Sequence, residues 1–322
     1  MKPATRNWTA LTILAGLTAT TGVSFVLFKA SVLAQEPFAR GESSWFIAAH
    51  NLTPRFAVGV LGLLALYGGR VLRLTRREWT QAVFMAVMSF GGCLLQTDGL
   101  QRSTAATTAF LTQFYVILIP LWWALIQRRR PSGGVLLAAG LVLAGVAVLA
   151  RVDWQAFRLG RGETEILLAT FFFSLMLCAI NWPAFATNRA ERTTAAMFLI
   201  ECGGFGVVSV ATCRMPVHLV TPYASPSWLG LVVVTAVLGT AGPFLLMNRW
   251  QRFIPATEAG LLYSFGPVIA ALTEVALPAT LSRWVGIDYP NQPLTLALVT
   301  GGALILGANV LIQLRPEKPP ST

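Results

Sequence analysis

The chain has 322 residues, of which 55% are hydrophobic and only 11% are charged, against about 25% charged residues in an ordinary soluble domain. This composition excludes a soluble globular protein, because water cannot be the main solvent of so apolar a chain. The formal net charge of +11 does not indicate nucleic-acid binding, because the basic residues fall in small groups between apolar runs instead of along one stripe.

Ten apolar runs follow one another along the chain, each long enough to cross the hydrocarbon core of a bilayer, and short connections join them. We expect one transmembrane helix in each run. The first run ends in a stretch that resembles a signal-peptidase site, but it is too long for a signal peptide, so we expect a retained helix. The predicted spans are 10–33, 45–68, 79–97, 103–127, 133–150, 164–186, 194–213, 227–248, 255–278 and 293–314.

The basic residues predict the orientation of these spans, because cytoplasmic connections carry an excess of Lys and Arg. With the N-terminus inside and ten spans, fifteen basic residues lie inside and seven lie outside, while Lys29 and Arg55 fall within spans. We therefore expect a multi-pass protein of the bacterial inner membrane with both termini in the cytoplasm. The four cysteines lack metal-ligand spacing, so we expect free thiols and neither a metal nor a cofactor.

Two segments 150 residues apart resemble each other. The segments 101–111 and 251–261 share six of eleven residues, among them Gln101 with Gln251 and Thr107 with Thr257. A second similarity pairs the glycines of 140–145 with those of 302–307. Five helices per repeat is an odd number, so the second copy enters the membrane from the opposite side. We expect an all-α fold of ten transmembrane helices in two inverted five-helix repeats, 1–151 and 160–315.

The segments from Asp98 to Pro120 and from Ala256 to Pro267, with the two glycine pairs, resemble the EamA-type repeat of the drug/metabolite transporter superfamily. The resemblance covers nearly the whole chain and implies a central substrate cavity between the repeats. One departure concerns the Gly-Glu pair that family members often carry at the ends of spans four and nine. Here Ile126-Gln127-Arg128 and Pro278-Ala279-Thr280 stand near those places, so the resemblance does not carry a substrate with it.

Charged side chains inside hydrocarbon cost about 2.5–3.5 kcal/mol each on insertion scales, so those within spans are candidates for a binding site. Arg55 lies about halfway along span two, and Glu201 lies on span seven, its inverted equivalent. We expect both to face one cavity, with Arg55 as a ligand for a substrate carboxylate and Glu201 in proton coupling. The alternative for each is a structural hydrogen bond or ion pair.

Other candidates have equally simple structural explanations. Lys29, near the outer end of span one, can extend its stem toward the headgroups. Glu258 follows Pro255 in the first turn of span nine and can cap the helix N-terminus. The family resemblance favours a cavity-facing position for Glu258 and Tyr263. Uncharged candidates for substrate contacts, which can also serve as interhelical hydrogen bonds, are Gln113, Tyr115, Asn181 and Tyr263.

These features favour a secondary transporter that exports a small metabolite, such as an amino acid, by alternating access. The sequence has no Gly-x-x-x-x-Gly-Lys-Ser/Thr loop, so protons or the membrane potential are the expected energy source. One alternative is a translocase of a lipid or polyprenyl-linked carrier. A membrane-embedded enzyme is less favoured, because the chain offers only His50 and His218. Expected partners are the substrate and membrane lipid, but no nucleic acid; a homodimer through the glycine pairs is an open alternative to packing within the monomer.

Overall fold

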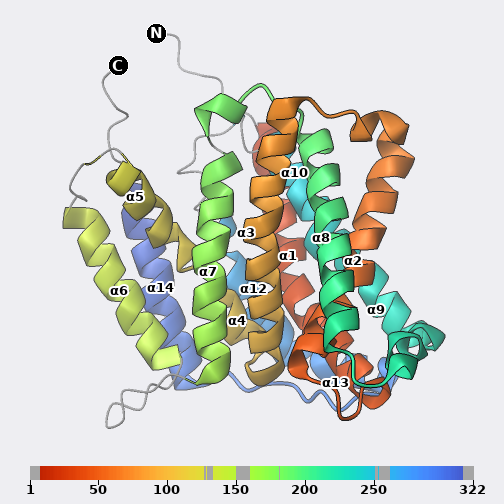
Figure 1. Cartoon of the computed structure of the whole chain (residues 1–322). Coiled ribbons are helices and arrows are strands. Elements are labelled where there is room, and N and C mark those ends of the chain that lie inside the picture. Colours follow the sequence, from red (N-terminus) through yellow and green to blue (C-terminus); the bar gives the residue numbers. More distant parts are fainter. Residues whose placement is uncertain are drawn as a thin grey trace.

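The computed structural model describes residues 8–126, 128, 133–149, 160–180, 182–250, 253 and 262–314. Every regular element in these ranges is helical, and the long helices stand side by side in one bundle (Figure 1). The α-helices are α1 (Trp8–Gln35), α2 (Ser44–Tyr67), α3 (Arg76–Arg102), α4 (Ala105–Thr112), α5 (Tyr115–Ile126), α6 (Gly133–Leu149), α7 (Arg161–Ile180), α8 (Ala190–Thr212), α9 (Pro226–Ala236), α10 (Gly242–Trp250), α12 (Gly266–Ala276), α13 (Pro278–Val285) and α14 (Leu296–Leu314).

The described helices make this a multi-pass membrane protein. Seven helical segments are long and apolar enough to cross a bilayer, and α12 with α13 forms an eighth if this bent pair is one span. Shorter apolar helices lie within α6 and α14. The expected all-helical fold is confirmed for the described residues, and ten spans stay a prediction with which these helices are compatible.

Three of the predicted spans are interrupted. The fourth breaks into α4 and α5 at residues 113–114, and the eighth contains a π turn, Val237–Ala241, between α9 and α10. Near the end of predicted span nine, α12 and α13 meet at an angle of 57°. Pro278 begins the new helix there, because it has no N–H to continue the old one. Irregular backbone at membrane depth persists only where it is buried in protein or lines a cavity, so these breaks indicate where to look for one.

The strongest helix packing joins the first half of the chain to the second. α2 packs along α8, α3 along α7 and α6 along α14, while α4 packs on α12 and α1 contacts α9, α10 and α12. The crossing of α3 and α7 brings the two backbones into contact. A Cβ atom on Gly99 would lie only 2.6 Å from the carbonyl oxygen of Gly162, so this crossing requires glycine.

In each glycine pair of spans five and ten, one glycine packs against another element and the other faces open space. A Cβ atom on Gly145 would lie 2.8 Å from the carbonyl oxygen of Gly301, and one on Gly302 would meet the ring of Phe110 at 2.7 Å. Gly140 and Gly307 have open space instead, with no atom of another element within 4 Å of a built Cβ. One glycine of each pair therefore packs within the chain, and a dimer contact through the others stays a prediction.

Carboxylates tie the loops together at both ends of the bundle, which we name the Arg76 end and the Arg102 end after the two ends of α3. At the Arg76 end, Glu78 accepts a hydrogen bond from the backbone N–H of Arg189 and lies 3.6 Å from Arg192. Glu78 also forms a capping box with Thr75, which explains why α3 begins before the predicted run at residue 79.

At the Arg102 end, α3 continues beyond the predicted run because charged groups hold its last turn. Asp98 lies 2.7 Å from Arg161 and 3.2 Å from Arg102, which joins α3 to the start of α7. In the same region Glu42 accepts hydrogen bonds from the backbone N–H of Arg214 and from the ring of His218. Burial alone would raise the pKa of Glu42, but these hydrogen bonds outweigh it and hold the pKa below its usual value.

Candidate functional site

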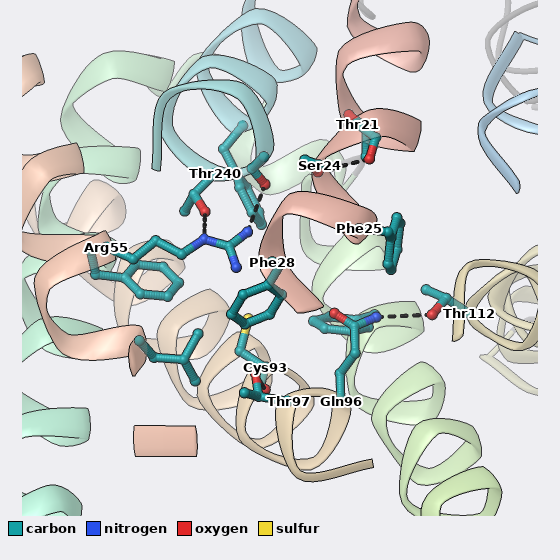
Figure 2. Close-up of a pocket in the computed structure, with 15 residues that line it drawn as sticks. Thr21, Ser24, Phe25, Phe28, Arg55, Cys93, Gln96, Thr97, Thr112 and Thr240 are labelled. Atoms are coloured by element: carbon teal, nitrogen blue, oxygen red, sulfur yellow. Dashed lines mark hydrogen bonds between the residues drawn. The ribbon is translucent and has the colours of Figure 1, made fainter. Parts of the chain in front are cut away.

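Two adjoining cavities lie between α1, α2, α3, α4, α7, α10 and α12, beside the breaks in spans four and eight. Their volumes are about 190 Å³ and about 200 Å³. Figure 2 shows the first cavity, with side chains from several of these helices converging on it. The lining residues that the two cavities share are Thr21, Phe25, Thr112, Phe173, Gly239 and Phe244. Because the walls are shared, we treat the two volumes as one site and call it the central cavity.

Arg55 projects from α2 into the central cavity and is held from two directions (Figure 2). Its Nε donates to the hydroxyl of Thr240, and its Nη2 donates to the carbonyl oxygen of Gly239 at 3.2 Å. The guanidinium carbon also lies 4.1 Å from the centre of the Phe28 ring, within the range of a cation–π contact. These contacts fix the side chain while leaving Nη1 without a hydrogen-bond partner among the described residues.

The π turn of span eight supplies the two partners of Arg55. The N–H of Gly242 donates to the carbonyl of Val237, five residues earlier, so the turn holds one residue more than an α-helix. Pro243 has no N–H, so the carbonyl of Gly239 cannot make the usual helical bond four residues on. That free carbonyl accepts from Arg55 instead. The break in the helix thus becomes a binding position for a cation.

A second contact to a backbone carbonyl four residues before a proline lies where spans four and nine meet. Pro267 has no N–H to donate, and the amide Nε2 of Gln113 donates to the carbonyl oxygen of Tyr263 at 3.5 Å. Gln113 is buried, and its Oε1 has no hydrogen-bond partner among the described residues. Tyr115 also lines the cavity beside these residues. This junction places polar groups from both halves of the chain on one wall.

Hydroxyl groups elsewhere on the wall are bound to their own helices. Thr21, Thr97 and Thr112 each donate to the carbonyl four residues earlier. The amide of Gln96 donates to the hydroxyl oxygen of Thr112 at 2.9 Å, which links α3 to α4 inside the cavity. The threonine oxygens still have lone pairs, so this wall offers acceptors of moderate strength but no negative charge.

The structure brings some of the predicted site residues together and separates others. Arg55, Gln113, Tyr115 and Tyr263 line the central cavity. Glu201 and Lys29 do not belong to its described lining. Asn181 and Glu258 lie outside the described residues.

Glu201 lies on α8, fully buried, next to the cavity wall and not in it. Neither carboxyl oxygen has a hydrogen-bond partner among the described residues. Ser89 and Cys93 of α3 lie beside it, and Cys93 also lines the part of the cavity that Arg55 enters. Cys93 therefore separates Glu201 from the cavity in which the sequence predicts both charged residues.

Lys29 binds the backbone at the corner between α3 and α4. Its Nζ donates to the carbonyl oxygens of Leu100 and Gln101, at 2.6 Å and 3.0 Å, where the last turn of α3 leaves carbonyls unpaired. On the other side of the corner, Glu274 accepts from the backbone N–H groups of Ala105 and Ala106 at the start of α4, both at 2.7 Å. Lys29 and Glu274 also line a separate hollow of about 560 Å³ at the Arg102 end.

Sequence reasoning missed three wall residues that carry polar contacts, namely Thr240, Gly239 and Gln96. A threonine or glycine within an apolar run resembles many others in the chain. The signal that could have found Gly239 is Pro243, because a proline inside a span frees the carbonyl four residues before it. No comparable signal in the sequence distinguishes Gln96 from a packing residue.

Comparisons with known proteins agree with this architecture. Residues 7–151 match the model of the EamA-like transporter family. An uncharacterized transporter from Archaeoglobus fulgidus is 24% identical over 301 residues, which cover 91% of this chain and 82% of that protein. A crystal structure described only as that of a protein matches with a TM-score of 0.57 and 19% identity, over 96% of this chain and 98% of the other. That last likeness concerns the fold alone.

Proposed function

Because residues 7–151 belong to the EamA-like transporter family, we propose that the chain is a secondary transporter that carries a small metabolite across the bacterial cytoplasmic membrane. The observation that carries the proposal is the central cavity, which lies among membrane-spanning helices where both halves of the chain meet. Buried polar groups at this depth mark a substrate pathway in membrane proteins.

The packing of the helices supports two inverted repeats. The pairs α2 with α8 and α6 with α14 each join spans that are predicted equivalents, two with seven and five with ten. The contact between α3 and α7 recurs in the second half as the contact of α1 with α9 and α10. A two-fold axis in the membrane plane relates these contacts. Gln113 and Tyr263, which are 150 residues apart, meet at the same place.

Alternating access follows from this symmetry in our proposal. Each repeat takes one of two related conformations, and exchanging them closes one end of the cavity while it opens the other. The broken spans provide the hinges, because a helix that is already interrupted bends without losing further hydrogen bonds. Residues 113–114 of span four and the π turn of span eight both lie beside the cavity.

We place the Arg76 end of the bundle in the cytoplasm. Arg70 and Arg73 lie in the connection before α3, and Arg76 and Arg77 are the first residues of α3; such basic segments stay on the cytoplasmic side. In Figure 1 the start of α1 and the end of α14 lie at this same end. Both termini are then cytoplasmic, in agreement with the excess of basic residues in those connections.

The size of the central cavity favours a small substrate over a lipid. Its two parts, about 190 Å³ and about 200 Å³, together lie near the lower limit of the roughly 300–1,000 Å³ typical of pockets for drug-sized ligands. An amino acid or a metabolite of similar size fits such a volume. A lipid or polyprenyl chain does not fit, so translocation of these carriers is the alternative outcome of the test.

Proton coupling through Glu201 is the second part of the proposal. An ionised carboxylate without partners is costly to bury, so this carboxyl group is expected to be neutral in the conformation described here. A conformation that opens α8 toward water would allow it to ionise. Such an exchange would link proton release to the movement that carries the substrate.

Flux measurements in proteoliposomes test the proposed transport. The purified full chain is reconstituted, and entry of labelled amino acids and organic acids is compared with translocation of labelled lipids. We expect flux of a small compound that the Thr21→Trp substitution abolishes, because Thr21 lines both parts of the cavity. Thr12→Trp, on the exposed side of α1, should keep the flux. Lipid translocation without flux of any small compound would overturn the proposal.

A further inference from the structure

Arg55 is the charged side chain among the described residues that line the central cavity. Among the described residues that line the cavity it has no acidic neighbour, and no ion pair of the described residues includes it. The side chain is 8% exposed, so water does little to compensate its charge. A buried cation without a counter-ion is costly unless a ligand supplies the negative charge.

The free edge of the guanidinium has the geometry of a carboxylate site. Nε and Nη2 use the side edge of the group for Thr240 and Gly239, and Phe28 covers one face. The end edge, formed by Nη1 and the second N–H of Nη2, has no protein partner among the described residues. Two parallel N–H groups at such an edge match the two oxygens of a carboxylate.

The rest of the described wall near Arg55 combines five aromatic rings with uncharged hydroxyl and amide groups. Phe25, Phe28, Phe56, Phe173 and Phe244 line this part of the cavity. The nearby threonine hydroxyls donate to their own helices, and no described lining residue carries a negative charge that would bind an ammonium group. The described wall thus packs around an apolar body next to the anion, and it offers a cation only neutral acceptors.

We propose that the substrate is a small carboxylate with an apolar, preferably aromatic, body. Its carboxylate binds the end edge of Arg55, and its body packs among the phenylalanines of the cavity. This inference rests on the proposed transport function and deepens it by naming the class of substrate. Thr240 and Gly239 act as positioning residues that aim the guanidinium.

Calorimetric titration of the purified full chain with four molecules of similar shape tests the proposal. The ligands are 3-phenylpropionate, its uncharged amide, 3-phenylpropylamine and phenylalanine. We expect the carboxylate to bind at least about 30-fold more tightly than the amide or the amine, the range for losing one partner of a buried charged pair. Phenylalanine should bind more weakly than 3-phenylpropionate, because its ammonium group meets no described acid.

The variants separate the role of Arg55 from a general effect of charge. Arg55→Gln should remove the preference for the carboxylate, and Arg55→Lys should keep only part of it, because an ammonium group has no fork for two oxygens. Arg283→Gln changes an exposed arginine of α13 outside the cavity and should bind as the unchanged protein does. If Arg55→Gln fails to fold, the ligand series and Arg55→Lys still decide.

The outcomes that overturn this inference differ from those that overturn the transport function. Equal binding of the amide or the amine, a preference that survives in Arg55→Gln, or no binding of 3-phenylpropionate each overturns the substrate class. Flux of cations or neutral compounds that is independent of Arg55 would do the same while leaving the transport function intact. If carboxylate binding depends on Arg55 but no small compound crosses the proteoliposome membrane, the transport function is overturned. The carboxylate-binding site at Arg55 is then still supported.

Discussion

Arg55 and Glu201 show how differently two buried charges are treated within one bundle. Arg55 has a hydroxyl, a carbonyl and an aromatic ring around it, so its charge is partly satisfied by dipoles. Glu201 has no hydrogen-bond partner for either oxygen among the described residues. The first arrangement suits a group that stays charged and binds an anion. The second suits a group that exchanges a proton when its surroundings change.

Glu201→Gln tests this distinction at the level of one residue. Glutamine has the shape of the neutral acid but cannot ionise, so flux should lose most of its dependence on pH. The measurement is proteoliposome flux of the labelled compound found in the transport screen, over a series of pH values. Glu191→Gln, in the first turn of the same helix, is the matched control and should keep the pH profile. Coinciding profiles for Glu201→Gln and the unchanged protein would contradict proton coupling through this residue.

At the level of helices, interruptions and close crossings have different structural roles. The breaks in spans four and eight expose carbonyls and amides to the central cavity, whereas the crossing of α3 and α7 is fixed by backbone contact at Gly99 and Gly162. Ion pairs between Asp98 and Arg161 hold the same crossing at its end. We therefore expect any movement to occur at the breaks and not at the crossing of α3 and α7.

Gly99→Ala should destabilise the α3–α7 crossing. The new methyl group would lie 2.6 Å from the carbonyl oxygen of Gly162, and this backbone atom cannot yield as a flexible side chain would. We expect a loss of about 1–3 kcal/mol, the usual cost of overpacking. Gly203→Ala, where nothing lies within 4 Å, should be neutral or slightly stabilising. Thermal unfolding in detergent, followed by tryptophan fluorescence, gives the midpoint temperature of each variant. Equal midpoints for Gly99→Ala and the unchanged protein would contradict the close backbone contact.

At the scale of the whole molecule, we propose that the two halves repeat their packing about an axis in the membrane plane, which requires opposite orientations of the halves. The loop before α2 then lies on one face of the membrane, and the corresponding loop before α8 lies on the other. Glu42 ties the first loop to the start of the loop after α8, whereas Glu78 ties the second loop to α3 at the opposite end of the bundle. The two ends are therefore held by separate sets of contacts.

Cysteine labelling in intact cells tests the opposite orientation. Arg40→Cys and Thr187→Cys place one exposed thiol in each of these loops, in a chain whose four native cysteines are replaced. A membrane-impermeant maleimide should label the Arg40→Cys variant from outside and the Thr187→Cys variant only after the cells are opened. Labelling of both variants from the same side would contradict the inverted symmetry and the alternating access inferred from it.

The sequence by itself determined that the described part of this membrane protein is all-helical, and it predicted the approximate bounds of most described helices and which charges lie within spans. Hydropathy is a local property, so a single run of residues carries that information. The resemblance to the EamA-type repeat is confirmed for residues 7–151 in the same way, because it depends on residues near one another in the chain.

Only the tertiary structure decided which of those charges reach the central cavity and what surrounds them. Arg55 meets Gly239 and Thr240 from about 185 residues away, at a π turn, while Glu201 on the neighbouring helix α8 does not belong to the described lining. The face that a helix turns inward depends on its partners' shapes and on close crossings such as Gly99 with Gly162. Those partners lie far away in sequence, so the cavity exists only once the two halves have packed.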